Sequence, residues 1–205
     1  ANWADNADWR YWDDPLIELE GNANGIIGFG RIGQAEGRIA KALGMNVLAY
    51  DLYPNDTGRA IAEYVTLDEL YARADVITLH CNLTPENTGM INKNSIAKMK
   101  DGVILVNTSR GALVKTEDLI EGIRLHKFAG VGLDVYEEET KNVFEDRSDE
   151  ILEHSTTARL LSFPNVMITS HQGFFTKEAL EAIAETTLQN ALDFESGKKS
   201  PNQVQ

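Results

Sequence analysis

The chain has 205 residues, 42% hydrophobic and 25% charged, which is the balance of a globular protein rather than a disordered one. Its net charge of −13 argues against nucleic acid as a partner, because nucleic-acid binding normally requires a basic surface. Cys81 is the only cysteine, so no disulfide forms within the chain, and we expect a reducing, cytoplasmic compartment. No apolar stretch approaches the roughly eighteen residues of a membrane-spanning helix, so a membrane is not an expected partner.

Residues 1–20 carry all three tryptophans among acidic side chains, without a clear period. Two interpretations have equal weight: a surface segment whose aromatic rings pack on the domain, or a linker that remains from a separate substrate domain. The segment starts without Met, so a processed, excised or engineered chain is expected. Residues 21–205 are predicted to form one dinucleotide-binding domain, whose residues 175–205 return toward the substrate domain.

From Asn24 onward, apolar runs alternate with amphipathic segments. The runs predict strands over residues 25–29, 46–51, 75–81, 103–107, 129–136 and 165–170. Helical spacing predicts helices over residues 32–43, 66–72, 95–99, 116–127 and 177–195, with Gly44 and Gly197 as C-terminal stops and Thr176 as an N-cap. Apolar strands that alternate with helices indicate an α/β fold: a Rossmann-type, doubly wound, mostly parallel sheet with helices on both faces.

The first strand leads into Gly28, Gly30 and Gly33, which have the G-x-G-x-x-G spacing of a dinucleotide-binding turn. In such a turn, backbone N–H groups and a helix N-terminus face the pyrophosphate. Asp51 follows eighteen residues after Gly33 and is predicted to bind the ribose hydroxyls, which favours NAD over NADP. The structural alternative for Asp51 is an aspartate that starts the turn before Pro54.

Further polar residues follow the ends of the other predicted strands, and these ends lie on one edge of a parallel sheet. Arg110 could bind a carboxylate in a bidentate manner, although a surface ion pair is the simpler alternative. His171 is a candidate general acid–base, and His80 competes with it on position alone, whereas His126 and His154 are weaker candidates. A carboxylate beside His171 would raise its pKa, and spacing cannot choose among Glu137, Glu138 and Glu139. This set favours hydride transfer between a nicotinamide cofactor and a small 2-keto or 2-hydroxy acid, and no metal-binding spacing accompanies it.

These motifs together resemble the D-isomer-specific 2-hydroxyacid dehydrogenase family from Pro15 to the C-terminus. They are GIIGFGRIGQ, VLAYD, LHCNLTPENTGMIN, MKDGVILVNTSRGALV, GLDVYEEE and SHQGFFTKEAL. The tail most resembles the fermentative D-lactate dehydrogenases of this family, whereas YWDDPLIELEG is similar to its glycerate-dehydrogenase-like members.

The resemblance implies a role for each matching residue. Arg110 would hold the substrate carboxylate and carbonyl, His171 would act as the acid–base, and Glu139 would pair with His171. Phe174 would form an apolar wall near the substrate. The residues implied at the NAD site are Gly28, Gly30, Arg31, Ile32, Gly33, Asp51, Cys81, Asn82, Asn87, Thr108, Ser109 and Asp134.

The chain departs from the family pattern in two ways. Asn82 stands where the family usually has Pro, which concerns loop rigidity more than chemistry. The family's substrate domain is formed mainly by residues that precede the dinucleotide domain, so we expect NAD binding with weak or no turnover of pyruvate. The alternatives are a corepressor-like NAD-sensing module or a dehydrogenase for glycerate and hydroxypyruvate. Relatives commonly dimerise through this domain, so a homodimer is also expected.

Overall fold

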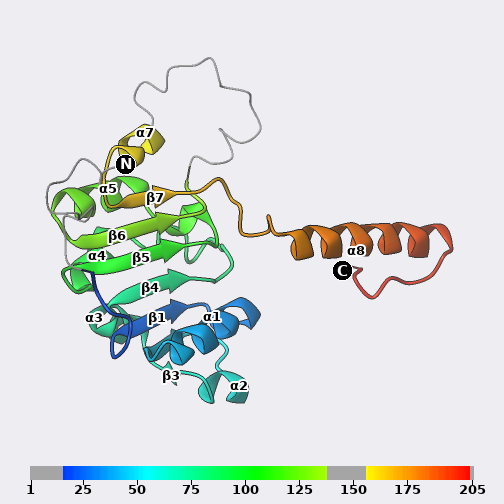
Figure 1. Cartoon of the computed structure of the whole chain (residues 1–205), viewed down its shortest axis with the longest axis horizontal. Helices are drawn as coiled ribbons and strands as arrows, with labels where there is room; N and C mark the ends of the chain where they lie inside the picture. Colours follow the sequence, from blue (N-terminus) through cyan, green and yellow to red (C-terminus); the bar gives the residue numbers. More distant parts are fainter. Residues whose placement is uncertain (1–15, 138–155, 204–205) are drawn as a thin grey trace, which may run out of the picture.

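A computed structural model of the protein describes residues 16–137 and 156–203. Seven strands form one sheet in the order β3-β2-β1-β4-β5-β6-β7 (Figure 1), and every pairing between them is parallel. This arrangement confirms the predicted Rossmann-type fold. The strands are β1 (Ala23–Ile27), β2 (Asn46–Tyr50), β3 (Glu63–Tyr64), β4 (Val76–Leu79), β5 (Val103–Asn107), β6 (Phe128–Leu133) and β7 (Val166–Ile168).

Helices cover the two faces of the sheet unequally. The helices are α1 (Arg31–Ala42), α2 (Asp56–Arg59), α3 (Leu67–Arg73), α4 (Lys93–Lys98), η1 (Gly111–Leu113), α5 (Thr116–Arg124), α7 (Thr156–Leu161) and α8 (Lys177–Glu195). The larger hydrophobic cluster joins the sheet to α3, α4, α5 and α7, whereas a smaller one lies beneath α1. The face that carries α1 is left uncovered by the described helices near β6 and β7, where Ala129 and Met167 are exposed.

Local hydrogen bonds explain several element boundaries that the sequence predicted. Thr66 and Glu69 form a capping box that starts α3, and the Thr176 hydroxyl accepts the Ala179 N–H at the start of α8. Gly44 follows α1 with a φ of +80°, and Gly197 follows α8 with a φ of +68°. Both glycines therefore adopt the left-handed conformation that ends a helix without steric cost.

Other boundaries differ from the prediction for identifiable reasons. The first strand begins two residues earlier, at Ala23, because Asn24 is polar yet buried. It also ends earlier, at Ile27, because Gly28 turns the chain with a φ of +90°. Helix α5 ends at Arg124 rather than at residue 127, because His126 adopts a φ of 57° and its N–H donates to the Ile123 carbonyl. The short elements α2, β3, η1 and α7 were not predicted, because segments of two to six residues carry too little periodicity.

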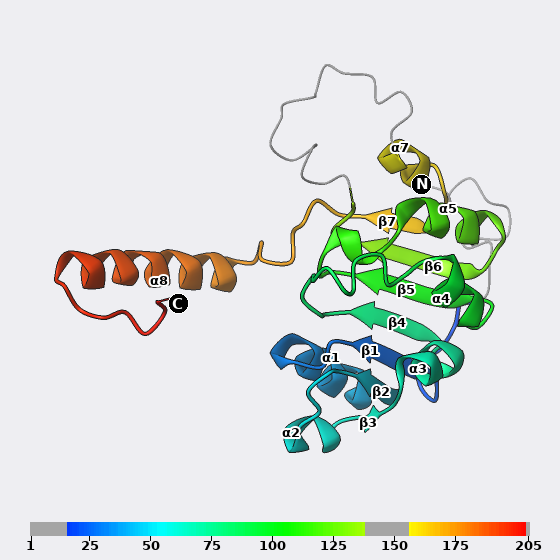
Figure 2. The ribbon, with the colours of Figure 1, turned by 180° about the vertical axis from the view of Figure 1, so that it is seen from behind.

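Helix α8 extends away from the sheet (Figures 1 and 2). It has 19 residues and none of them is buried. Its apolar side chains are exposed, including Ile183, Leu188 and Leu192. No helix among the described residues is both long and apolar enough to cross a membrane.

Candidate cofactor and substrate site

The carboxyl ends of the parallel strands form one edge of the sheet, and we call this edge the rim. The strand order reverses between β1 and β4, because β1 is followed by β2 on one side and leads to β4 on the other. Open α/β sheets bind ligands at such a reversal. The glycine turn leaves β1 at this point, so the fold positions it where a dinucleotide site is expected.

The three glycines of the turn face different surroundings. A Cβ at Gly28 would lie 2.3 Å from the Cys81 backbone nitrogen, and a Cβ at Gly33 would lie 2.2 Å from the Gly28 carbonyl oxygen. These two positions therefore allow close packing of the turn against β4 and of α1 against the turn. By contrast, nothing lies within 4 Å of a Cβ at Gly30. Gly30 thus leaves the open cradle that a pyrophosphate requires.

The first turn of α1 is suited to an anion. Its N-cap, Gly30, makes no side-chain hydrogen bond, and no acidic residue lies in the turn. The N–H groups of a helix's first turn have no partner within the helix and carry its positive dipole end. Arg31 and Ile32 are exposed at this end of the helix. The side chain of Gln34 donates to the Phe29 carbonyl at 3.0 Å and thereby braces the turn.

Asp51 directly follows β2 and connects the second strand to the glycine turn. Its Oδ2 atom accepts the Phe29 N–H at 2.6 Å, and its Oδ1 atom accepts the Tyr53 N–H at 2.8 Å. Each carboxylate oxygen retains a further lone pair that can accept a hydroxyl. Asp51 therefore holds the turn and keeps further acceptor capacity.

Arg110 is exposed on a turn that follows β5. Asn107, which is fully buried, accepts the Ser109 N–H at 3.0 Å and donates to the Arg110 carbonyl at 2.9 Å. The Ser109 hydroxyl donates to the Cys81 carbonyl at 2.6 Å, so the turn is also fastened to the end of β4. Sequence reasoning missed this clamping role of Asn107, and its only signal was a polar residue at the end of an apolar run.

The loop after β4 contains the other residues implied at the NAD site. Asn87 accepts the Thr84 N–H at 2.8 Å and donates to the Asn82 carbonyl at 2.7 Å. These bonds order the loop even though Pro is absent at position 82. Cys81 is half-buried, and burial raises the pKa of its thiol, which keeps it protonated. Thr108 is exposed on the neighbouring turn.

Asp134 anchors the segment that carries His171. Its Oδ1 atom accepts the Thr169 hydroxyl and the Gln172 N–H at 2.8 Å, and its Oδ2 atom accepts the Gly173 N–H at 3.0 Å. Burial alone would raise the pKa of Asp134, but these bonds, together with the nearby His171, lower it. The carboxylate is thus charged at neutral pH and holds the loop to β6.

His171 is exposed at the rim and has a φ of 55°, in the left-handed region that non-glycine residues seldom adopt. His126 has a similar φ, but it lies in a helix-ending motif that explains the conformation. His171 follows a strand instead, where the strained conformation requires support from its surroundings. Its N–H donates to the Asp134 carbonyl at 2.9 Å, which supplies part of that support.

His80 is less suited to acid–base chemistry than His171. Its Nε2 atom is enclosed and has no hydrogen-bond partner among the described residues. Burial lowers the pKa of His80, so the imidazole is neutral at neutral pH. The residue ends β4, and its N–H donates to the Ile27 carbonyl.

The carboxylate candidates beside His171 are only partly described. Glu138 and Glu139 lie outside the described residues. The side chain of Glu137 accepts the Thr116 N–H at 3.2 Å, so it is engaged at the start of α5. Phe174 is half-exposed after the His171 loop, and its ring contacts that of Phe175 edge to face.

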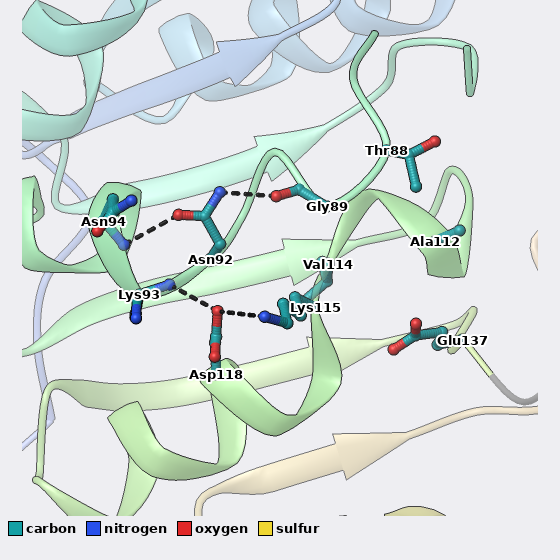
Figure 3. Close-up of a pocket in the computed structure, with 10 residues that line it drawn as sticks. All are labelled: Thr88, Gly89, Asn92, Lys93, Asn94, Ala112, Val114, Lys115, Asp118 and Glu137. Atoms are coloured by element: carbon teal, nitrogen blue, oxygen red, sulfur yellow. Dashed lines mark hydrogen bonds and ion pairs between the residues drawn. The ribbon is translucent and has the colours of Figure 1, made fainter. Parts of the chain in front are cut away.

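A pocket of about 390 Å³ lies beside α4 and α5 (Figure 3), and no residue of the glycine turn lines it. Thr88, Ala112 and Glu137 line the end of the pocket that is nearer the rim. Asp118 also lines the pocket: its carboxylate accepts the Lys93 N–H at 3.0 Å and lies 3.6 Å from the Lys115 ammonium. No group of three potential metal ligands occurs within residues 16–137 and 156–203.

The sequence is similar to those of known enzymes over almost its whole length. The profile "D-isomer specific 2-hydroxyacid dehydrogenase, NAD binding domain" matches residues 1–173. A 2-hydroxyacid dehydrogenase homolog of Haemophilus influenzae is 48% identical over 92% of this chain and 57% of its own length. The D-lactate dehydrogenase of Escherichia coli is 44% identical over 91% of this chain and 57% of its own length. A hydroxypyruvate reductase of Blautia hydrogenotrophica is 45% identical over 96% of this chain and 58% of its own length.

Solved structures of D-lactate dehydrogenases are similar to this chain in fold as well as in sequence. A D-lactate dehydrogenase from Treponema pallidum superposes with a TM-score of 0.89 at 36% identity, over 95% of this chain and 60% of the other. A D-lactate dehydrogenase with NAD+ from Lactobacillus jensenii has a TM-score of 0.88 at 32% identity, over 98% of this chain and 61% of the other. The chain spans a little more than half the length of the curated relatives that it matches.

Proposed function

Because the chain belongs to the NAD-dependent D-isomer-specific 2-hydroxyacid dehydrogenases, we propose that it is the NAD-binding part of an enzyme that interconverts D-lactate and pyruvate. The observation that carries the proposal is the shared rim, where the glycine turn, Asp51, Arg110 and His171 all follow the carboxyl ends of parallel strands.

NAD is the cofactor of this domain, and the rim residues fit it. The cradle above Gly30 and the uncapped first turn of α1 would receive the pyrophosphate, with Arg31 and Ile32 beside it. Asp51 would accept the ribose hydroxyls and repel the 2′-phosphate of NADP. Cys81, Asn82, Asn87, Thr108, Ser109 and Asp134 are proposed to line the remainder of the cofactor site.

When bound, the reduced cofactor supplies the hydride that reaches the keto carbon of the substrate. Arg110 would bind the substrate carboxylate with its planar guanidinium and polarise the neighbouring carbonyl. His171 would donate a proton to the carbonyl oxygen as negative charge develops there. The carboxylate of Glu139, which lies outside the described residues, would keep His171 protonated. In the opposite direction, His171 would accept the proton of the substrate hydroxyl.

The substrate is proposed from the relatives. Pyruvate is the first choice because of the 44% identical D-lactate dehydrogenase, and hydroxypyruvate is the second because of the similarly close hydroxypyruvate reductase. Phe174 would form an apolar wall near the substrate side chain. The relatives are named as dehydrogenases and reductases, which favours an enzyme over a corepressor-like interaction module.

We expect this chain to bind NAD(H) but to turn over substrate weakly or not at all. Arg110, His171 and Phe174 are exposed, and no described residue closes over them. Water exclusion and fixed substrate geometry each contribute large rate factors in such reactions. Residues 1–20 and α8 are proposed to connect to the part of the enzyme that covers the rim, which is consistent with the absence of buried residues in α8.

Fluorescence titration tests the cofactor assignment, and pyruvate is then added to the same sample. We expect NADH to bind at least tenfold more tightly than NADPH, and Asp51→Ala to remove this preference. Hydroxypyruvate is the matched second substrate. Tighter binding of NADPH would contradict the role of Asp51, and rapid consumption of NADH would contradict the expected catalytic deficit.

A homodimer is proposed through the outer face of α1. Ile32, Ile39 and Leu43 are 70%, 63% and 52% exposed, and with Ala35 and Ala42 they form one apolar stripe at helical spacing. A second copy of the chain would bury this stripe around a two-fold axis. A cytoplasmic location is proposed as well, because the single cysteine leaves the chain without an internal disulfide.

A further inference from the structure

One acidic side chain lies between α1 and the sheet, in surroundings that are otherwise mostly apolar. Glu36 belongs to the second turn of α1, and the Nδ2 group of Asn24 in β1 donates a hydrogen bond to its Oε1 atom. Asn24 is 1% exposed and Thr78, in the adjacent strand β4, is 7% exposed. The small hydrophobic cluster beneath α1, which includes Ile26 and Ala40, adjoins them. A charged carboxylate is costly in such a position unless its oxygens are hydrogen-bonded.

The hydrogen bonding of this cluster is incomplete if Glu36 is ionised. The Asn24 Oδ1, Glu36 Oε2 and Thr78 Oγ1 atoms are buried without a partner in the described structure. The first two are both acceptors when Glu36 is charged, so they cannot bond to each other. A single proton on Oε2 changes this, because the carboxyl then donates to Asn24 Oδ1 while Oε1 still accepts from Asn24 Nδ2. An acid and an amide thus exchange two hydrogen bonds.

We propose that Glu36 is held as a neutral carboxylic acid paired with Asn24, and that this pair positions α1 for cofactor binding. The positioning role rests on the proposed function, because the N-terminal turn of α1 would receive the pyrophosphate. The neutral state of Glu36 depends only on the buried cluster.

The surrounding charges do not provide an alternative partner. Arg38 and Lys41 on α1 are exposed, and Lys41 donates to the Ala60 and Ile61 carbonyls. Asp75, before β4, accepts the Ala23 N–H and pairs with Lys100. Burial raises the pKa of Glu36, and the nearby side chains of Asn24 and Thr78 only partly oppose this rise. Desolvation is therefore the dominant cause, and it favours the protonated form.

The pair has a direct consequence for the glycine turn. Gly33 lies one turn before Glu36 on α1, and its backbone packs so closely on the turn that a Cβ would lie 2.2 Å from the Gly28 carbonyl oxygen. Such close packing leaves little room for α1 to move relative to the turn. Ionisation would draw Glu36 toward water and displace α1 from this position. We therefore expect NADH affinity to fall as pH rises through the native pKa of Glu36.

Glu36→Gln tests the protonation state, because glutamine has the shape of the protonated acid and remains neutral at every pH. A raised native pKa adds stability that is complete below the unfolded pKa and is lost as pH rises through the native value. Relative to Glu36→Gln, the wild-type folding equilibrium constant should fall by up to tenfold per pH unit between the unfolded and native pKa values of Glu36, and it should level off above the native value. Glu121→Gln, at an exposed position of α5, is the matched control and should follow the wild type. Parallel stability curves for wild type and Glu36→Gln from pH 5 to pH 9 would overturn the assignment.

Infrared spectroscopy of the wild-type chain gives a second test, which reports the protonation state directly and requires no unfolding measurement. With ¹³C-labelled glutamate, an isotope-sensitive carbonyl band of a protonated carboxyl should be present at neutral pH. The band should be absent from Glu36→Gln and retained in Glu121→Gln. Its absence from the wild type would overturn the proposal.

NADH titrations at several pH values then test the positioning role. We expect the dissociation constant of the wild type to rise with pH and that of Glu36→Gln to stay constant. Equal pH dependence in both proteins would overturn the positioning role. If NADH binds to neither protein at any pH, the proposed function fails, and the infrared result still decides the protonation state.

Discussion

The glycines of the turn have separate roles at the residue scale, and two substitutions distinguish them. Gly30→Ala places a methyl group in open space, so we expect the free energy of unfolding to change by less than about 0.5 kcal/mol. The same methyl group occupies the pyrophosphate cradle, so the dissociation constant of NADH should rise at least tenfold. Gly28→Ala is the contrasting variant, because its φ of +90° and the nearby Cys81 backbone predict a loss of about 2 kcal/mol or more. Wild-type NADH affinity in Gly30→Ala would exclude the cradle as the binding site.

Asp134 should make the stability of the His171 loop dependent on pH. Its pKa is lowered in the folded protein, so its contribution is present above the unfolded value and is lost as pH falls through the native value. We expect Asp134→Asn to destabilise the protein by about 1–3 kcal/mol at pH 7. The difference from the wild type should shrink below pH 4. Urea unfolding at pH 7 and at pH 3 measures this, and a constant difference would show that charge is not involved.

At the scale of single elements, α8 is expected to contribute nothing to the stability of the sheet. It buries no residue, and an isolated helix of this length is marginal in water. Removal of residues 177–205 should therefore change the free energy of unfolding of the remainder by less than about 0.5 kcal/mol. Leu160→Ala in α7 is the comparison, because this side chain is 1% exposed and its loss should cost about 2–5 kcal/mol. A marked destabilisation on removal of α8 would show that the helix packs on the domain.

The elements also show what the sequence could and could not predict. The bounds of β5 and α8 were predicted to the residue, because an apolar run between two turns and a capped amphipathic helix are unambiguous signals. The start of β1 was wrong because Asn24 interrupts the apolar pattern, although its side chain is buried by pairing with Glu36. That pairing joins two elements, and no local pattern reveals it.

The candidate site was predictable to a similar extent. A parallel sheet brings the residues after its strands to one rim, so Asp51, Arg110 and His171 could be placed there from the sequence. Position alone left His80 as a competitor of His171, and the family resemblance made the choice. The support that Asn107 and Asp134 give to their loops could not be foreseen, because it depends on which backbone N–H groups the loops turn inward. The comparisons confirm the family, and the individual roles remain predictions.

The whole molecule is expected to associate through α1. Ile39→Glu introduces a charge at the centre of the exposed stripe, so we expect it to convert a dimer to a monomer in light scattering after gel filtration. Leu125→Glu is the matched control, because Leu125 is 71% exposed at the end of α5 and lies outside the stripe. A monomeric wild type, or an Ile39→Glu variant that stays dimeric, would contradict the interface.

The position of β1 in the interior of the sheet affects how the chain must fold during synthesis. It is made before β4, yet β4 is one of its two neighbours, and the bond from Ala23 to Asp75 spans 52 residues. At about 5–20 residues per second, β4 leaves the ribosome roughly 3–10 seconds after β1. The apolar residues of β1 lack their final partner throughout this interval, and non-local parallel pairing is slow even in a complete chain. The nascent chain therefore passes through a period in which β1 is open to aggregation or to chaperone binding.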